Sequence, residues 1–524
     1  MSPLHVKGSR WSQCVVPPVR ALRMWSRVPG RQSVARWYSV GVRARAVKST
    51  PRGFSWPMAV GAVSSVVGYV AYNRFLSTGG VSLESRSTEP VSGALPTLEQ
   101  IEAKLHAREK SFWINRNTGV FRFDVSQLPS NNPIEDSHVE QIIALPGDGS
   151  RDLYFFGIFD GHGGPFTSSK LAKELVPYVL KRMLHNGLDA ADSTLRDAFV
   201  SFDHEVVIES FKNLFADPMN RGNVDNILPA VSGSCALLSV FDSKTDSLKV
   251  AVTGDSRTLV VGQNETDGKW FVKSCTIDQT GDNPKEVERI QGEHPGEPNV
   301  VRRGRILGSL QPSRAFGDHR YKVKEVEGKT LDSLPEHVKL YLRREPKDFL
   351  TPPYVTARPE VTTAAIARDN IKFMVMGSDG LFELLTNEEI ASLVIKWADR
   401  YMPNNKVGEQ LRGLPPVEDI SAEKESQRLA FRYKDKAPAG GQGFLLQDAN
   451  VATHLIRNAL SAGGRPEYVS TLVSIPAPMS RKYRDDLTVT VAFFGPDSES
   501  ITHNNSQQGM SINYEASTKP RANL

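Results

Sequence analysis

Cysteine is scarce in this 524-residue chain, which contains only Cys14, Cys235 and Cys275. The sequence has no Cys-x-x-Cys pair and no Cys/His spacing typical of zinc ligation, so nothing in it supports a zinc site. Cys235 stands in an apolar run, where a buried structural thiol is the expected state.

Acidic residues are absent from the first 83 positions, which carry twelve Lys and Arg. The remaining residues hold 52 basic and 59 acidic side chains, so this part is mildly acidic although the whole chain carries +5. That balance argues against a nucleic-acid-binding protein. The Arg-rich, acid-free start predicts a mitochondrial transit peptide over 1–53, with a basic disordered arm as the alternative.

Long hydrophobic runs are also missing, apart from the uncharged stretch 54–72. Its nineteen residues include three serines, a proline and two glycines, so it is only moderately apolar. The length fits one membrane crossing, and we predict a transmembrane segment within 54–74, with an amphipathic or buried helix as the alternative. Such a span would leave the following residues in the intermembrane space, whereas complete import would place them in the matrix.

The rest of the chain divides into a linker, a folded body and a tail. Residues 75–96 are rich in Ser, Thr, Gly and Pro and predict a flexible linker. The body covers 97–494 and begins with a short amphipathic helix that Thr97 caps. The polar residues 495–524 predict a disordered tail. The last three residues, Ala522-Asn523-Leu524, loosely resemble a peroxisomal signal and suggest a secondary peroxisomal pool, with an ordinary chain end as the alternative.

One short run carries the first chemical signal. Tyr154 to Phe159 reads as a buried strand, and it breaks into Asp160, Gly161, His162 and two further glycines. A carboxylate and an imidazole at one strand end are ingredients of a metal-assisted site. Asp-Gly is also a common turn dipeptide, so a plain turn is the alternative for this stretch alone.

Four further apolar strands bring acids to their ends. Antiparallel pairing would place the start of one strand beside the end of another, so these acids are expected to converge. Clustered carboxylates repel one another, and a divalent cation would relieve this. Oxygen-only ligation favours Mg²⁺ or Mn²⁺, and two such ions bridged by a water can drive displacement at phosphorus. The acids are Asp255 after 248–253, Asp379 after 371–376, Asp485 and Asp486 before 487–494, and Glu135 and Asp136 before an extended segment.

The segments between these strands predict a mixed α/β body. Residues 169–184 place Leu171, Leu175, Val179 and Met183 on one helical face. A second helix begins after 448, with Asp448 as its predicted cap. His454 on that helix is interpreted as a surface or packing residue, and His138 as structural.

These motifs, in this order, resemble those of the metal-dependent protein Ser/Thr phosphatases of type 2C. The resemblance covers about 112–494, and within the family it is closest to the mitochondrial pyruvate dehydrogenase phosphatase branch. The family motifs are Glu135-Asp136, Phe159-Asp160-Gly161-His162-Gly163-Gly164, Ser232-Gly233-Ser234, Gly254-Asp255-Ser256-Arg257, Arg314-Ala315-Phe316-Gly317-Asp318, Ser378-Asp379-Gly380 and Arg484-Asp485-Asp486. The branch motifs are Asn132-Pro133-Ile134-Glu135-Asp136, Glu286-Val287-Glu288-Arg289 with His294-Pro295, 351–357, 452–457 and 483–486.

The resemblance implies a fold and a site. The fold would be an α/β (α+β) four-layer α-β-β-α sandwich, with two central antiparallel sheets flanked by helices. Asp160 would bridge two metal ions, and His162 would be the general acid that protonates the leaving oxygen. The other implied metal ligands are the Gly161 carbonyl, Glu135, Asp379 and Asp485, with Asp255 and Asp379 at a third, weaker ion and Asp486 as a neighbour.

One departure from the family concerns phosphate binding. Many members hold the phosphate with an Arg four residues before the first Glu, and here that position is Asn131. The pyruvate dehydrogenase phosphatase branch also lacks this Arg, so activity need not be lost. A bidentate phosphate contact is missing, for which Arg302, Arg303 or Arg314 are candidate replacements.

The implied function is Mg²⁺/Mn²⁺-dependent hydrolysis of phosphoserine or phosphothreonine on a protein by a metal-activated water, with pyruvate dehydrogenase as the expected substrate. The alternatives are a phosphatase of another mitochondrial or peroxisomal protein, and a catalytically silent protein that only binds phosphoproteins. Polar segments at 320–350 and 403–447 interrupt the motifs and are interpreted as surface insertions that contact the protein substrate.

Overall fold

The computed structural model describes residues 95–114, 119–145, 151–188, 191–402, 413–421 and 443–495. The predicted transit peptide, transmembrane segment and linker, up to residue 94, lie outside these ranges, as does the predicted tail from 496 onward. The chain divides into a unit of residues 1–57 and a unit of residues 58–524, and all described residues belong to the second. Within the described ranges, no helix is both long and apolar enough to cross a membrane.

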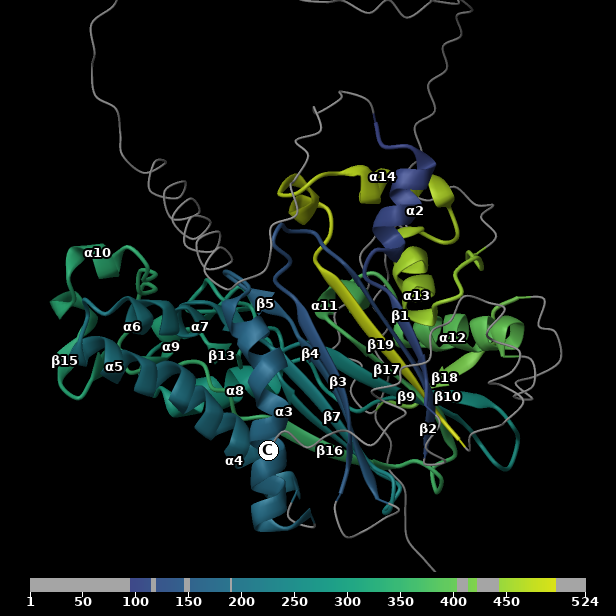
Figure 1. Cartoon of the computed structure of the whole chain (residues 1–524), viewed down its shortest axis with the longest axis horizontal. Coiled ribbons are helices and arrows are strands. Elements are labelled where there is room, and N and C mark those ends of the chain that lie inside the picture. The colour runs from purple at the N-terminus through teal and green to yellow at the C-terminus, as the bar shows by residue number, and fades with distance from the viewer. Residues whose placement is uncertain are drawn as a thin grey trace, which may run out of the picture. The chain divides into compact units, whose positions relative to one another are not determined.

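Two β-sheets form the centre of this unit (Figure 1). The larger sheet has seven strands in the order β1-β2-β19-β17-β9-β10-β18, and only β10 and β18 pair in parallel. Its strands are β1 (Lys110–Trp113), β2 (Val120–Leu128), β9 (Arg257–Gln263), β10 (Trp270–Ser274), β17 (Ile371–Gly377), β18 (Val417–Asp419) and β19 (Leu487–Phe494).

The second sheet has five strands in the order β16-β8-β7-β4-β3, and all of its pairs are antiparallel. Ser137 pairs with Phe159, so the start of β3 lies beside the end of β4. Ala236 pairs with Thr253, which brings the end of β8 to the same edge. Its strands are β3 (Ser137–Ala144), β4 (Asp152–Phe159), β7 (Ala236–Asp242), β8 (Ser247–Thr253) and β16 (Glu360–Ala365).

Helices cover the outer face of each sheet. One apolar cluster joins the seven-stranded sheet to α2 (Leu98–His106), α12 (Asn387–Tyr401), α13 (Val451–Leu460) and α14 (Pro466–Ser474). Another joins the five-stranded sheet to α3 (Phe166–Asn186) and α4 (Ala191–His204). A third cluster fills the space between the two sheets. Four layers with three buried interfaces confirm the predicted sandwich.

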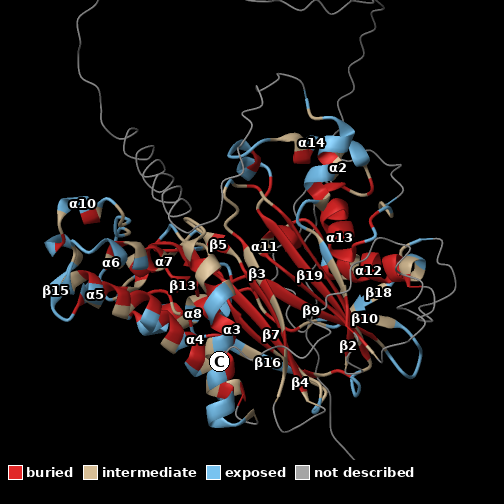
Figure 2. Cartoon of the chain, viewed as in Figure 1, coloured by how far each residue is buried: buried red, intermediate tan, exposed pale blue. Residues whose placement is uncertain are grey.

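The apolar sequence of β4 follows from its burial on both faces of the sheet. Leu153, Phe155 and Phe159 pack toward the helices, whereas Tyr154 and Phe156 pack between the sheets. Successive side chains of a strand point to opposite faces, so a strand buried on both sides needs apolar residues at every position. Figure 2 shows the same burial along the central strands of both sheets.

Shorter elements connect this sandwich and extend its α3/α4 side. The remaining helices are η2 (Glu205–Glu209), α5 (Ser210–Ala216), α6 (Arg221–Asn226), α7 (Leu228–Val231), α8 (Pro284–Glu293), α9 (His319–Lys322), η3 (Leu331–Ser333), α10 (Glu336–Lys339), α11 (Asp379–Phe382) and η7 (Met479–Lys482). The remaining strands are β5 (Gly161–His162), β6 (Gly233–Ser234), β11 (Val301–Arg302), β12 (Arg305–Ile306), β13 (Phe316–Gly317), β14 (Glu325–Val326) and β15 (Lys329–Thr330).

Two of the helix predictions are confirmed by the structure, and a third is wrong. Thr97 caps α2 in a reciprocal arrangement with Gln100, as expected. The predicted face of α3 is buried throughout. The predicted cap of α13 is wrong, because the Asn450 side chain accepts from the Thr453 N–H. Asp448 instead forms a buried ion pair with Arg457.

The predicted surface insertion at 403–447 also contributes to the sheet and to the core. Within it, residues 413–421 supply β18, which adds an edge strand to the seven-stranded sheet. Phe444, Leu445 and Leu446 pack against the apolar cluster that contains α12 and α13. The insertion at 320–350 holds α10 and the β14–β15 hairpin, and Val338 of α10 is fully buried.

Candidate active site

Three aspartates from three strand ends meet at one edge of the sandwich. Asp160 follows β4, Asp255 follows β8 and Asp379 opens α11 directly after β17. One carboxylate oxygen of each lies within 4.8 Å of the others. Burial, together with the charges of Asp136, Asp379 and Asp255, raises the pKa of Asp160 well above its usual value. The protein therefore gathers negative charge here that a bound cation would stabilise.

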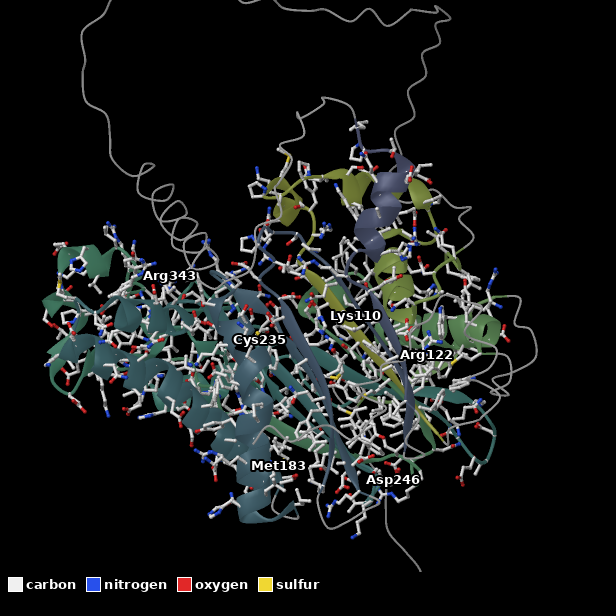
Figure 3. All side chains as sticks on the ribbon, in the orientation of Figure 1. Lys110, Arg122, Met183, Cys235, Asp246 and Arg343 are labelled. Atoms are coloured by element: carbon white, nitrogen blue, oxygen red, sulfur yellow. The ribbon has the colours of Figure 1, made fainter. Side chains whose placement is uncertain are left out.

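Cys235 lies against this trio (labelled in Figure 3). Its backbone N–H donates to the Asp160 carbonyl at 2.8 Å, and its thiol contacts Asp255 Oδ1 at 3.2 Å. Burial raises the pKa of the Cys235 thiol well above its usual value, and the nearby aspartates add to the effect. Cys235 is therefore a protonated structural thiol that donates to the acid cluster, in line with its predicted burial.

Glu135 and Asp136 are adjacent in sequence but face different parts of the site. Asp136 is buried, and burial followed by the charge of Asp486 raises its pKa well above normal. Its charge also acts on Asp160. Glu135 Oε1 instead accepts from the Gly164 N–H at 2.6 Å, and Oε2 accepts from Asn131 Nδ2 at 3.0 Å. The sequence places Asp136 among the converging acids, but the family resemblance assigns the metal role to Glu135 alone, since adjacent acids cannot be told apart without knowing which one the strand turns inward.

The two aspartates before β19 also divide their roles. Asp485 pairs with Arg481, whose positive charge also reaches Asp160. Asp486 is 1% exposed and accepts the backbone N–H groups of Ser130, Glu135 and Asp136, the first two at 2.5 and 2.8 Å. Asp486 therefore holds the loop that carries the first two acids. This geometry leaves Asp485 as the member of the pair that a metal could share.

His162 is held by an aspartate 156 residues away. The strands β13, β6 and β5 form a small sheet, in which His162 pairs with Gly233 and Phe316 pairs with Ser234. Asp318 follows β13, and His162 Nε2 donates to its Oδ2 at 2.5 Å. Burial lowers the pKa of His162, but the charge and hydrogen bond of Asp318 outweigh it and leave the pKa raised.

Glycines make this pairing possible. A Cβ at Gly233 would lie 2.1 Å from His162 Nε2 and 2.2 Å from Asp318 Oδ2, so only glycine fits between them. Gly161, the predicted carbonyl ligand, has equally little room, because a Cβ there would lie 2.1 Å from the Glu135 carbonyl. The glycines of both motifs therefore serve close packing around the imidazole and the acids.

The donor set at the strand ends fits a hard divalent cation. Asp160, Asp255 and Asp379 offer only carboxylate oxygens, and the charge of Asp136 also acts on Asp160, which is the ligand chemistry of Mg²⁺ or Mn²⁺. The Asp485 side chain lies near Gly380, the residue that follows Asp379. Among the described residues, a second acid cluster formed by Glu102, His106 and Asp448 does not fit a metal in the same way. The Arg457 guanidinium already bonds both of its carboxylates, with its Nη2 at 2.6 Å from Glu102 and 2.7 Å from Asp448.

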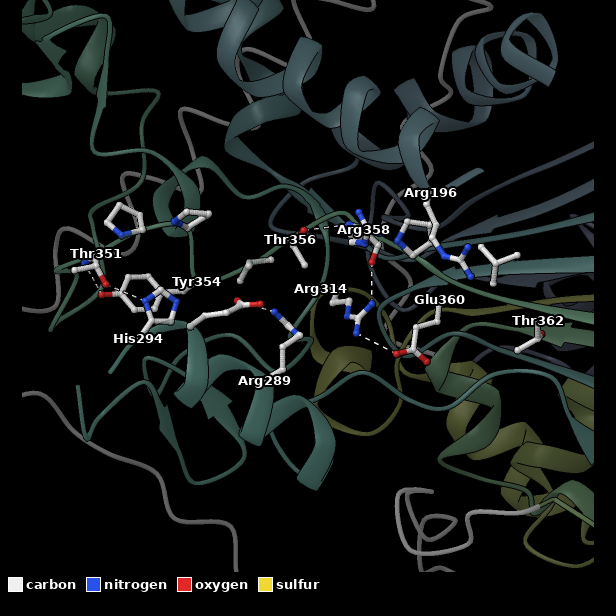
Figure 4. A pocket seen from close by; sticks show the side chains of 16 residues that line it. Arg196, Arg289, His294, Arg314, Thr351, Tyr354, Thr356, Arg358, Glu360 and Thr362 are labelled. Carbon is white, nitrogen blue, oxygen red and sulfur yellow. Dashed lines mark hydrogen bonds and ion pairs between the residues drawn. The ribbon is translucent and has the colours of Figure 1, made fainter. Parts of the chain in front are cut away.

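The three arginines considered as phosphate ligands differ in what the structure gives them. Arg314 lines a separate open pocket, where it bonds Glu360 (Figure 4). It also bonds the buried Glu286. Arg302 bonds the Leu307 carbonyl at 2.9 Å and pairs with Asp348. Arg303 stands at a left-handed turn position, with φ 52°. Arg314 and Arg302 are thus already bonded to other groups.

The known proteins that this chain resembles in sequence are protein phosphatases. The protein phosphatase 2C family model matches residues 129–414. The chain is 61% identical over 446 residues to the mitochondrial pyruvate dehydrogenase (acetyl-transferring) phosphatase 1 of Saccharomyces cerevisiae, which covers 81% of this chain and 77% of that protein. It is 28% identical over 470 residues to the Bos taurus protein of the same name, covering 76% of this chain and 83% of that protein. A solved serine-threonine phosphatase 2C from Toxoplasma gondii aligns with a TM-score of 0.40 and 17% identity, over 74% of this chain and 98% of that one.

Proposed function

This chain belongs to the protein phosphatase 2C family, and from that premise we propose that it removes phosphate from serine or threonine of mitochondrial pyruvate dehydrogenase. The catalytic class follows from the family: the chain is a protein serine/threonine phosphatase. The observation that carries the proposed site is the meeting of Asp160, Asp255 and Asp379 beside the His162–Asp318 pair. The substrate rests on the names of the two relatives, both called pyruvate dehydrogenase phosphatases.

The proposed metal ligands are Asp160, Asp379, Asp485, Glu135 and the Gly161 carbonyl. Asp255 and Asp379 would hold a third ion, and the charge of Asp136 also acts on Asp160. When bound, two Mg²⁺ or Mn²⁺ ions would neutralise the phosphoryl oxygens and lower the pKa of the attacking water.

The protein's own part in the chemistry centres on proton delivery. Asp318 accepts the Nε2–H of His162 and stabilises the protonated imidazole. The second N–H of that imidazolium, at Nδ1, has no bonded partner among the described residues and can pass its proton to the leaving serine oxygen. A serine alkoxide is a poor leaving group, so this proton lowers the barrier to P–O cleavage.

The proposed phosphatase activity is tested with a phosphoserine peptide and the full-length chain. We expect phosphate release with Mn²⁺ and loss of that release when EDTA removes the metal. Turnover that persists in EDTA would contradict the metal site, and no turnover with any divalent metal would favour the catalytically silent alternative.

The substrate assignment needs a separate measurement. We expect the phosphatase to restore the activity of phosphorylated, inactive pyruvate dehydrogenase. Peptide hydrolysis without this restoration would point to another phosphoprotein of the mitochondrion or the peroxisome.

A mitochondrial location accompanies the proposal. The Arg-rich leader predicted at 1–53 and the word mitochondrial in the names of both relatives support it. The side of the inner membrane, the predicted anchor at 54–72 and a peroxisomal pool remain proposals from the sequence, since all of these residues lie outside the described ranges.

A further inference from the structure

The site has a shortage of positive charge where a phosphate must arrive. Asn131 lies four residues before Glu135, and its side-chain amide donates to Glu135 Oε2 at 3.0 Å. A neutral amide cannot offset the charge of a phosphate dianion as a guanidinium does. Arg481 stands near Asp160 but pairs with Asp485. The nearby Lys322 bonds Asp203 at 2.6 Å and the Ala315 carbonyl at 2.7 Å.

Arg343 reaches this place from the segment that follows α10. Its Nη2 donates to the carbonyl of Gly163 at 2.7 Å, across 180 residues of sequence. Gly163 is the residue directly after His162. A Cβ at Gly163 would lie 2.3 Å from Nη2, and its φ of +72° also favours glycine, so the loop leaves space for the guanidinium. Figure 3 labels Arg343 on the side of the molecule where α6, α7 and β5 lie.

The positive charge of Arg343 acts on both His162 and Asp318. It lowers the pKa of His162 and of Asp318, in each case as a smaller contribution beside the mutual effect of the pair. The side chain is exposed, and the Gly163 carbonyl is its only hydrogen-bond partner among the described residues. A guanidinium carries five N–H donors, so most of them remain available to a ligand.

We propose that Arg343 binds the phosphoryl oxygens of the substrate and supplies the positive charge that the neutral Asn131 cannot provide. The bond to the Gly163 carbonyl holds the guanidinium next to the residue that follows His162. The ligand class is a phosphate monoester dianion, and inorganic phosphate, the product, would bind to the same group. This proposal rests on the proposed phosphatase function.

Three variants of the full-length protein test this role. Arg343→Ala removes the guanidinium group, and Arg343→Lys keeps its charge without its paired N–H donors. Arg344→Ala is the matched control, because Arg344 is an exposed arginine next in sequence. Binding of inorganic phosphate is measured by calorimetry in saturating Mn²⁺, and KM and kcat are measured with the phosphoserine peptide. Charge-assisted hydrogen bonds predict that Arg343→Ala weakens phosphate binding and raises KM by about 10- to 100-fold, that Arg343→Lys falls between, and that Arg344→Ala changes neither.

A compensating variant makes the test sharper. Asn131→Arg in the Arg343→Ala background should recover at least part of the lost phosphate affinity, which a merely structural role for Arg343 would not allow. The concentration of Mn²⁺ that gives half-maximal activity should stay the same in Arg343→Ala, Arg343→Lys and Arg344→Ala, none of which changes a residue that contacts a proposed metal ligand.

The proposal is overturned if Arg343→Ala binds phosphate as tightly as the wild type, or if Arg344→Ala loses as much affinity. These outcomes are distinct from failure of the proposed function, which would appear as a wild-type protein without turnover. Phosphate calorimetry would still report on Arg343 in that case.

Discussion

At the scale of single residues, the properties of His162 depend on two neighbours that touch it through space. Asp318 accepts its Nε2–H, and Gly233 leaves the gap in which the two side chains meet. Neither neighbour is close to His162 in sequence. The short sheet β13-β6-β5 brings the three motifs together and so joins separate sequence patterns into one histidine–aspartate pair.

Replacing Asp318 should affect substrates according to their leaving groups. We expect Asp318→Asn to lower kcat for a phosphoserine peptide by about 10- to 100-fold, because the imidazolium loses its carboxylate partner. The same variant should change the hydrolysis of p-nitrophenyl phosphate much less, since nitrophenolate leaves without a proton. Steady-state kinetics with both substrates provides the comparison, with the exposed Asp369→Asn as control. Equal losses on both substrates would argue that Asp318 serves the fold or the metals rather than the acid.

Asp486 offers a stability test at the same scale. Asp486→Ala would leave the buried N–H groups of Ser130 and Asp136 without their acceptor. Each buried donor left unsatisfied costs about 1–3 kcal/mol, so we expect the free energy of unfolding to fall by about 3 kcal/mol or more. Urea denaturation of the metal-free protein measures this, and Asp369→Ala should leave it nearly unchanged. A loss below about 1 kcal/mol would show that the loop is held by other contacts.

The sequence predicts the acids of the site better than their partners. An apolar strand ends just before each of Asp160, Asp255 and Asp379, and this pattern is visible in the sequence. Arg343 carries no such signal, because its contact with Gly163 spans 180 residues and depends on the path of an inserted segment. Such through-space pairs follow from topology, which local patterns do not specify.

At the scale of elements, α13 carries a buried histidine next to its ion pairs. His454 Nε2 donates to the Leu393 carbonyl at 3.2 Å, and Nδ1 accepts from Asn458 at 3.2 Å. One nitrogen donates and the other accepts, so the neutral ring satisfies both bonds. Burial lowers the pKa of His454 to about 3. The packing alternative offered for this residue is the one that agrees with its burial.

This histidine should make stability depend on pH. The folded pKa is below the usual value of about 6.5, so the contribution is present above pH 6.5 and is lost as pH falls toward 3. The free energy of unfolding should decrease by up to about 1.4 kcal/mol per pH unit from this group below pH 6. We expect His454→Gln to flatten the decline measured by urea denaturation between pH 7 and pH 5.

The exposed His185→Gln on α3 is the control and should keep the wild-type slope. A His454→Gln protein with an unchanged slope would mean that other groups dominate the acid sensitivity.

Elements with a clear period were predictable, and short ones were not. The β19 run 487–494 and the buried face of α3 follow directly from alternation and helical spacing. Strand β18 has three residues of mixed polarity within a polar segment, so nothing in its sequence marks it as part of a sheet. The cap of α13 was misassigned because Asp448 and Asn450 are both good caps, and only the ion pair with Arg457 distinguishes them.

At the scale of the whole molecule, location and substrate must agree. Pyruvate dehydrogenase is a matrix substrate, whereas a span at 54–72 would hold the phosphatase on the other side of the inner membrane. The proposed substrate therefore predicts that the body of the chain resists added protease in mitochondria with ruptured outer membranes. Digestion under these conditions, with matrix markers intact, would contradict pyruvate dehydrogenase as the substrate.

We expect the acid cluster around Asp160 to hydrolyse phosphoserine with the help of divalent metal. The most direct measurement compares wild type, Asp160→Asn and the surface control Asp369→Asn on phosphorylated pyruvate dehydrogenase in Mn²⁺. We predict that wild type and Asp369→Asn release phosphate and restore dehydrogenase activity. Because metal assistance is worth several kcal/mol, Asp160→Asn should be slower by about a thousandfold. Phosphate release by a folded Asp160→Asn protein at the wild-type rate would contradict the account.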